Sequence, residues 1–93
     1  MEEQITSRVA QATSVLKAAG ATEVYLFGSA AGGSLRDSSD VDLAVAGLPP
    51  QRYFEQASRL AGILGRPIDL IDLDEDTPFT RYLRGSGELR RVG

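Results

Sequence analysis

Apolar residues alternate with acidic or small residues from position 40 to position 45, and this two-residue period is typical of a β-strand. Val41, Leu43 and Val45 fall on one face, which we expect to enter the core. Asp40 and Asp42 then leave the opposite face together, with their backbone positions about 6.5–7 Å apart. On a helix the same two carboxylates would point in different directions. The pattern therefore predicts a buried strand that presents two aspartates side by side.

The segments around this strand predict helices and further strands in alternation. Apolar residues at three- and four-residue spacing indicate helices, and runs of β-branched and aromatic residues indicate strands. The expected helices span 3–19, 51–64 and 78–84. The expected strands span 23–27, 40–45 and 67–73. The last residues form either a terminal strand or a frayed tail. This order predicts an α/β (α+β) fold, a small mixed β-sheet with helices packed on it.

The second expected helix has one apolar face. Its members recur at helical spacing and are Phe54, Ala57, Leu60, Ala61 and Leu64. We expect this face to pack on the sheet.

Length and composition narrow the function classes. The chain has 93 residues, which predicts a single domain over residues 1–93. It contains no histidine and no cysteine, which excludes imidazole bases, Ser-His-Asp triads and thiolate metal sites. Any metal must then be held by oxygen ligands, which favours magnesium or manganese. The net charge of −3 argues against binding of free nucleic acid. No apolar run reaches the roughly 20 residues of a membrane span and the N-terminus lacks a secretory signal, so we expect a cytoplasmic protein.

A segment rich in glycine and serine, residues 28–39, lies between two of the expected strands. Such a turn can place backbone N–H groups at Gly28 and the hydroxyl of Ser29 against phosphate oxygens. Ser39 can cap or orient the start of the strand at Asp40. The segment lacks the patterns of a Walker A loop and of a dinucleotide-binding loop. A plain tight loop is the alternative, but the two aspartates that follow favour a site for a metal-bound nucleoside triphosphate.

Asp69 is the third carboxylate of interest. It stands in an apolar strand, where an unpaired charge is costly. If that strand lies beside the strand of Asp40 and Asp42, the three carboxylates share one face. Asp72 and Asp74 form a competing pair, which we interpret as part of a solvated turn at the end of the strand. For Asp40 and Asp42, an exposed and charged strand face is the alternative to a metal site.

The order and spacing of these residues resemble the nucleotidyltransferase superfamily that includes DNA polymerase beta, and specifically its minimal nucleotidyltransferase (MNT) branch. The matching segments are Gly28-Ser29, Ser39-Asp40-Val41-Asp42-Leu43 and Pro67-Ile68-Asp69-Leu70. The resemblance spans most of the chain and implies the nucleotidyltransferase fold. One departure is Gly32, since family members commonly carry an arginine there. Its absence removes a phosphate contact.

The resemblance also implies a Mg²⁺-dependent enzyme that moves AMP from ATP to a hydroxyl and releases pyrophosphate. Asp40 and Asp42 would bind two Mg²⁺ ions, with Mn²⁺ as an alternative metal, and Asp69 would bind the catalytic ion and help to deprotonate the acceptor. The implied nucleotide-binding residues are Gly28, Ser29 and Ser39. Members of the branch act with a helical HEPN-type partner, often as the antitoxin of a toxin–antitoxin pair, and some transfer AMP to a tyrosine of the toxin.

Two other functions stay open at this point. The chain could be a non-catalytic antitoxin that neutralises its partner by covering it. It could also modify a tRNA end or a small molecule, although the acidic net charge and the single domain count against this. The base preference, the acceptor and a homo-oligomeric state are left open by the sequence.

Overall fold

The computed structural model describes residues 2–28 and 41–93, with side chains from residue 7 onward in those ranges. Its elements, in chain order, are α1 (Glu2–Ala18), β1 (Glu23–Phe27), β2 (Val41–Ala46), the 3₁₀ turn η1 (Pro50–Arg52), α2 (Tyr53–Leu64), β3 (Ile68–Asp72), α3 (Pro78–Ser86) and β4 (Arg90–Arg91). The expected helices and strands are confirmed to within a few residues at their ends. The last residues form a short strand and not a frayed tail. Within the described ranges, no helix is both long and apolar enough to cross a membrane.

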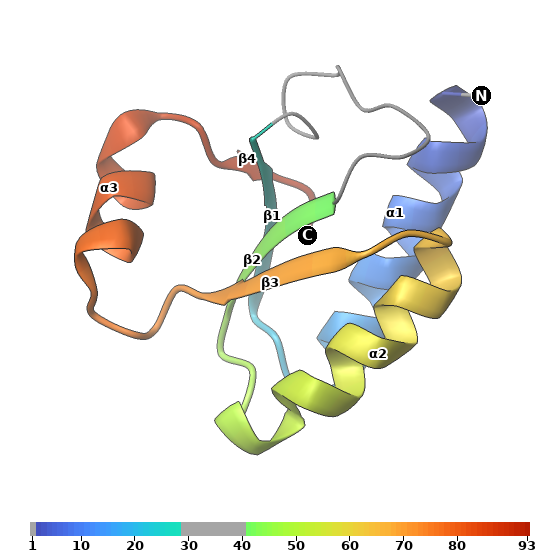
Figure 1. Cartoon of the computed structure of the whole chain (residues 1–93), viewed down its shortest axis with the longest axis horizontal. Coiled ribbons are helices and arrows are strands. Elements are labelled where there is room, and N and C mark those ends of the chain that lie inside the picture. The colour runs from blue at the N-terminus through green and yellow to red at the C-terminus, as the bar shows by residue number, and fades with distance from the viewer. Residues whose placement is uncertain (1, 29–40) are drawn as a thin grey trace.

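The four strands form one mixed sheet in the order β3-β2-β1-β4. β1 is antiparallel to β2 and to β4, whereas β2 and β3 are parallel. The parallel pair is connected through α2, as a parallel pair requires. Helices α1 and α2 cover one face of the sheet, and α3 lies on the other (Figure 1). The expected fold class, a small mixed sheet with helices packed on it, is therefore confirmed.

The main core lies between the sheet and the pair α1 and α2. Val41, Leu43 and Val45 are each at most 1% exposed and pack there with Leu16 and Leu60. The face assigned to these residues from their alternation is thus confirmed.

A smaller core fills the opposite face of the sheet. Ala44 and Ala46 are buried there with Phe27 and with Leu83 of α3. On this face Asp42, near the start of β2, is only half-buried, whereas Ala44 and Ala46 are buried.

The apolar face expected for α2 was wrong at one position. Phe54 is 93% exposed, whereas Gln56, Leu60 and Leu64 are buried. The buried residues follow a four-residue spacing, and Phe54 lies about 200° around the helix from Gln56. The first buried position of α2 is thus the polar Gln56, which a pattern of apolar residues does not indicate.

The position of α3 is set by hydrogen bonds at its start and its end. Thr77 caps the helix: its Oγ1 accepts from the backbone N–H of Thr80 at 3.1 Å, and the Thr80 hydroxyl accepts from the Thr77 N–H at 3.0 Å. Near the other end, Arg84 donates from Nη2 to the carbonyl of Leu73 at 2.9 Å. These contacts hold the helix against the turn that follows β3.

Candidate active site

Three neighbouring strands bring the described candidate residues together where β1 ends and β2 and β3 begin. In the sheet register Phe27 of β1 is opposite Asp42 of β2, and Asp42 is opposite Asp69 of β3. Gly28 follows Phe27 directly and ends β1. The condition stated for Asp69, that its strand lies beside that of Asp42, is met. Asp40, together with Ser29 and Ser39, lies outside the described residues.

The two described carboxylates are neighbours on adjacent parallel strands, which run about 4.8 Å apart. Both belong to the face that α3 partly covers, because Ile68 and Leu70, on either side of Asp69, pack into the main core instead. Asp42 is half-buried and Asp69 is exposed. Like charges on neighbouring strands repel each other, and a cation between them relieves the repulsion. The pair is therefore a candidate for holding a cation.

The exposure of Asp69 corrects one argument from the sequence. We expected an unpaired charge in an apolar strand to carry a burial cost, but the side chain of Asp69 reaches solvent. β3 is an edge strand, so a residue whose side chain leaves the main core is not covered there. The case for Asp69 thus depends on its register with Asp42 and not on its burial.

Gly28 approaches the carboxylate of Asp42 closely. Its φ is +64°, in the left-handed region that glycine adopts without strain. A Cβ built at this position would lie 2.5 Å from Oδ2 of Asp42, which is closer than real contacts allow. The turn after β1 therefore needs a residue without a side chain if Asp42 is to keep its orientation.

The wall of the site on the α3 side is aromatic. The rings of Phe27 and Phe79 meet edge to face, with centroids 6.1 Å apart and an interplanar angle of 66°. Phe27 neighbours Asp42 in the sheet register. The carboxylates thus lie beside an apolar surface, where electrostatic interactions are stronger than in open water.

The carboxylates of the competing pair, Asp72 and Asp74, accept hydrogen bonds from backbone N–H groups. Asp72 is the half-buried last residue of β3, and its Oδ1 accepts from the N–H of Asp74 at 2.9 Å. Asp74 is exposed in the turn, and its Oδ2 accepts from the N–H of Gly47 at 2.6 Å. The solvated turn expected here is therefore correct for Asp74, whereas Asp72 belongs to the strand. Both side chains brace the turn.

The donor set of the candidate site suits a hard divalent cation. Asp42 and Asp69 supply carboxylate oxygens, which magnesium and manganese prefer. In residues 2–28 and 41–93 no group of three or more acidic side chains is arranged to hold a metal. The third carboxylate expected for such a group, Asp40, precedes β2 directly and lies outside those ranges.

The sequence of the chain matches that of a known protein family. The sequence pattern of the family described as polymerase beta, nucleotidyltransferase matches residues 8–89, nearly the whole chain. The chain belongs to this nucleotidyltransferase family. The matched region includes Gly28, Asp42 and Asp69, the described residues of the candidate site. No curated protein matches the sequence.

Solved structures agree with this nucleotidyltransferase assignment. A protein described as a minimal nucleotidyltransferase is 29% identical, with a TM-score of 0.79 over 97% of this chain and 94% of the other. A chain of a toxin–antitoxin crystal structure with AMP-PNP is 24% identical, with a TM-score of 0.71 over 92% of this chain and 70% of the other. A chain from the complex of tri-AMPylated Shewanella oneidensis HEPN toxin with MNT antitoxin is 22% identical, with a TM-score of 0.66 over 98% of this chain and 71% of the other. The last two similarities show that this nucleotidyltransferase shares their fold.

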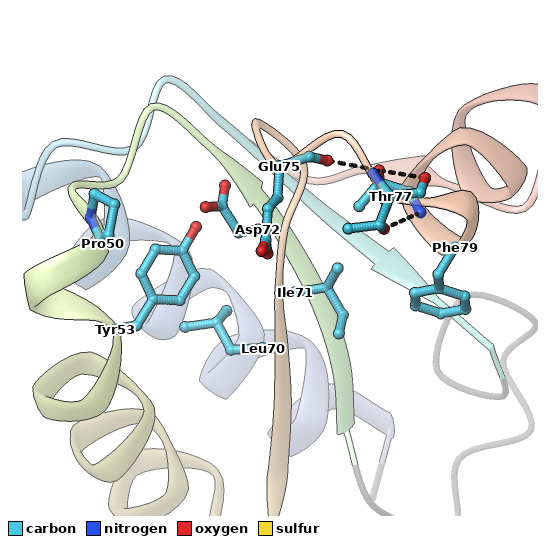
Figure 2. Close-up of a pocket in the computed structure, with 9 residues that line it drawn as sticks. Pro50, Tyr53, Leu70, Ile71, Asp72, Glu75, Thr77 and Phe79 are labelled. Carbon is cyan, nitrogen blue, oxygen red and sulfur yellow. Dashed lines mark hydrogen bonds between the residues drawn. The ribbon is translucent and has the colours of Figure 1, made fainter.

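The sequence interpretation missed a groove elsewhere on this nucleotidyltransferase. It has a volume of about 470 Å³ and lies along β3, between Tyr53 of α2 and Phe79 of α3 (Figure 2). The available signal was these two aromatic residues, of which Tyr53 falls outside the apolar face expected for residues 51–64.

Proposed function

We propose that this nucleotidyltransferase transfers AMP from ATP to a hydroxyl of a protein partner in a Mg²⁺-dependent reaction. The acceptor that we propose is a tyrosine of a HEPN-type toxin, so that the chain acts as an antitoxin in the cytoplasm. Family membership supports nucleotidyl transfer. The similarity to chains of toxin–antitoxin complexes, one with AMP-PNP and one with an AMPylated HEPN toxin, supports the choice of nucleotide and partner.

The observation that carries the proposal is the register of Asp42 with Asp69 beside Gly28. This arrangement supports a metal-assisted phosphoryl transfer, because carboxylates that lie close together can bind the same cations. Mg²⁺ would be held by Asp42, Asp69 and Asp40, and it would neutralise charge on the phosphates as the α-phosphorus is attacked.

The side chains have separate roles in this proposal. Asp69 is the more exposed described carboxylate, so it is the better placed to accept the proton of the attacking hydroxyl. The new bond joins the hydroxyl oxygen to the α-phosphorus, the bond to the pyrophosphate oxygen breaks, and pyrophosphate leaves. Gly28 lets the turn after β1 approach the carboxylate of Asp42 closely, and we assign Ser29 and Ser39 to the phosphate side of the nucleotide.

The direct test is AMP transfer from α-labelled ATP to a HEPN-type toxin protein. Asp42→Asn and Asp69→Asn each keep the size of the side chain and remove its charge. We expect each variant to lose at least about a hundredfold in labelling, the scale of an essential group in the transition state. Asp76→Asn is the matched control, because Asp76 is an exposed aspartate that pairs with Arg81 at 2.7 Å, away from the site.

The outcomes separate the enzyme from a binding module. Loss of labelling in both site variants, with the control unaffected, supports the proposed transfer. Toxin neutralisation that survives in the double variant Asp42→Asn/Asp69→Asn would contradict it and would favour an antitoxin that acts by covering its partner. Magnesium- and ATP-dependent labelling of RNA or of a small molecule in place of the protein would contradict the proposed acceptor.

A further inference from the structure

The outer edge of β3 is an unpaired sheet edge. The N–H of Val41 donates to the carbonyl of Pro67, and the N–H of Leu73 donates to the carbonyl of Val45. Because bonding direction alternates along a strand, the odd-numbered residues of β3 face β2, and the backbone groups of Ile68, Leu70 and Asp72 face outward. Among the described residues, these outward groups make one backbone hydrogen bond, from the Glu75 N–H to the Asp72 carbonyl at 3.3 Å.

The groove of about 470 Å³ runs along this edge and has apolar walls on both sides (Figure 2). Tyr53 and Leu70 line it on the α2 side, and Ile71 and Phe79 line it on the α3 side. Phe79 is 46% exposed although it is a large aromatic residue. An added strand would place alternate side chains against these two walls while its backbone paired with β3.

The charge of the groove is acidic. Among the residues that the structure describes, Asp72 and Glu75 line it and no lysine or arginine does. Near Asp72 the hydroxyl of Tyr53 points toward the carboxylate without a hydrogen bond of ordinary geometry (Figure 2). Burial first, and then the neighbouring Asp72, raises the pKa of this hydroxyl, so it stays a neutral donor. The polar groups of the groove therefore suit a basic occupant.

A second copy of the chain fits this edge poorly. Two β3 strands paired with each other would bring two acidic grooves together, and this like charge is unfavourable. The opposite edge strand, β4, carries Arg90 and Arg91, but it is two residues long and could form few of the ladder bonds. Its shortness and its charges are features that limit edge-to-edge pairing, and β3 has a longer, partly apolar edge.

We propose that the β3 edge binds an extended, basic segment of a partner protein by strand addition. The segment pairs its backbone with Leu70 and Asp72, places apolar side chains against Tyr53 and Phe79, and places lysine or arginine near Asp72 and Glu75. This inference goes beyond nucleotidyl transfer, since it needs neither ATP nor metal. Its test is done without both, so that its outcome is independent of the proposed activity.

The probe is a capped peptide of valines flanked by lysines, long enough to span β3, added to the ¹⁵N-labelled chain, so that apolar side chains face both walls. We expect amide shifts confined to β3, the start of α2 and the start of α3. At a free peptide concentration ten times Kd, exchange of the Leu70 and Asp72 amides should slow about tenfold. A valine–glutamate peptide tests charge, and a valine–lysine peptide with alternate N-methylation tests backbone pairing.

A matched pair of variants tests the acidic residues. Asp72→Asn with Glu75→Gln should weaken the basic peptide about three- to tenfold, the scale of two partly screened charges. Glu55→Gln with Glu88→Gln changes the net charge equally but outside the groove, and it should leave the affinity unchanged. Equal binding of the three peptides, or equal weakening by the two double variants, would overturn the proposal. So would a peptide-free dimer, detected by sedimentation, that already protects Leu70 and Asp72.

Discussion

A methyl group at Gly28 gives the sharpest test of how the site is built. Gly28→Ala introduces a Cβ where Oδ2 of Asp42 lies, at a distance of 2.5 Å. The carboxylate is the end of a rotatable side chain, so it can turn away more cheaply than the two strands can separate. We therefore expect the variant to fold with a displaced Asp42 carboxylate, and to lose metal and nucleotide binding more than stability.

The size of the stability loss follows from the backbone. An alanine held at a φ of +64° pays about 1–2 kcal/mol for the left-handed conformation. For a domain of this size, each kcal/mol lowers Tm by about 4–8 °C. Gly87→Ala is the matched control, because Gly87 has a φ of +77° and a Cβ there would meet no atom within 4 Å. The two variants should lose similar stability, and Gly28→Ala alone should lose binding.

Two measurements decide the outcome. Urea unfolding gives the free energies of unfolding of the wild type and both variants, and calorimetric titration with ATP and Mg²⁺ gives the affinities. A double-mutant cycle that combines Gly28→Ala with Asp42→Ala should show strong coupling in the affinities, since removing the carboxylate removes the overlap. If Gly28→Ala binds ATP and Mg²⁺ as tightly as Gly87→Ala does, the close approach of Gly28 to Asp42 has no functional role.

Three further predictions concern packing, capping and pH. Leu60→Ala should cost about 2–5 kcal/mol because Leu60 is fully buried, and Phe54→Ala should cost less than about 0.5 kcal/mol because Phe54 is 93% exposed; similar losses in urea unfolding would contradict the observed face of α2. Thr77→Ala should cost about 1 kcal/mol through the lost cap of α3, and an unchanged Tm would show that the cap is dispensable. The pKa of Tyr53 lies above the ordinary 10.0 in the folded chain. Above pH 10 the hydroxyl therefore loses its proton in the unfolded state before it does so in the folded state. The free energy of unfolding then falls by up to about 1.4 kcal/mol per pH unit. Tyr53→Phe should lose less stability than wild type between about pH 9 and about pH 11, and equal losses would show that Tyr53 does not contribute.

The strands and the direction of the Asp42 side chain could be predicted from the sequence. Strict alternation at Val41, Leu43 and Val45 determines which face of β2 is buried, and this face in turn determines the direction of Asp42. The adjacency of Asp69 was predicted only as a condition, because no local pattern states which strands pair. The roles of Asp40, Ser29 and Ser39 remain predictions.

Other features could not be predicted from the sequence because they depend on tertiary contacts. Ala44 and Ala46 are small residues that are common on both buried and exposed faces of strands. The sequence of β2 therefore does not indicate that α3 covers them. Gln56 is polar and yet buried, and Phe54 is apolar and yet exposed, so hydrophobicity alone assigned the wrong face at the start of α2. The groove needs Tyr53 and Phe79 to lie on either side of β3, and these residues come from two helices that are distant in the chain.

The edge position of β3 has a consequence for how long the carboxylate pair persists. β2 is bonded on both sides, whereas β3 is bonded on one side only, so β3 can detach in a local opening that leaves β1 and β2 paired. Such an opening separates Asp69 from Asp42 while most of the chain stays folded. The lifetime of the site is then set by the fraying of one strand and is shorter than that of the fold, and any molecule that pairs with the free edge of β3 would lengthen it.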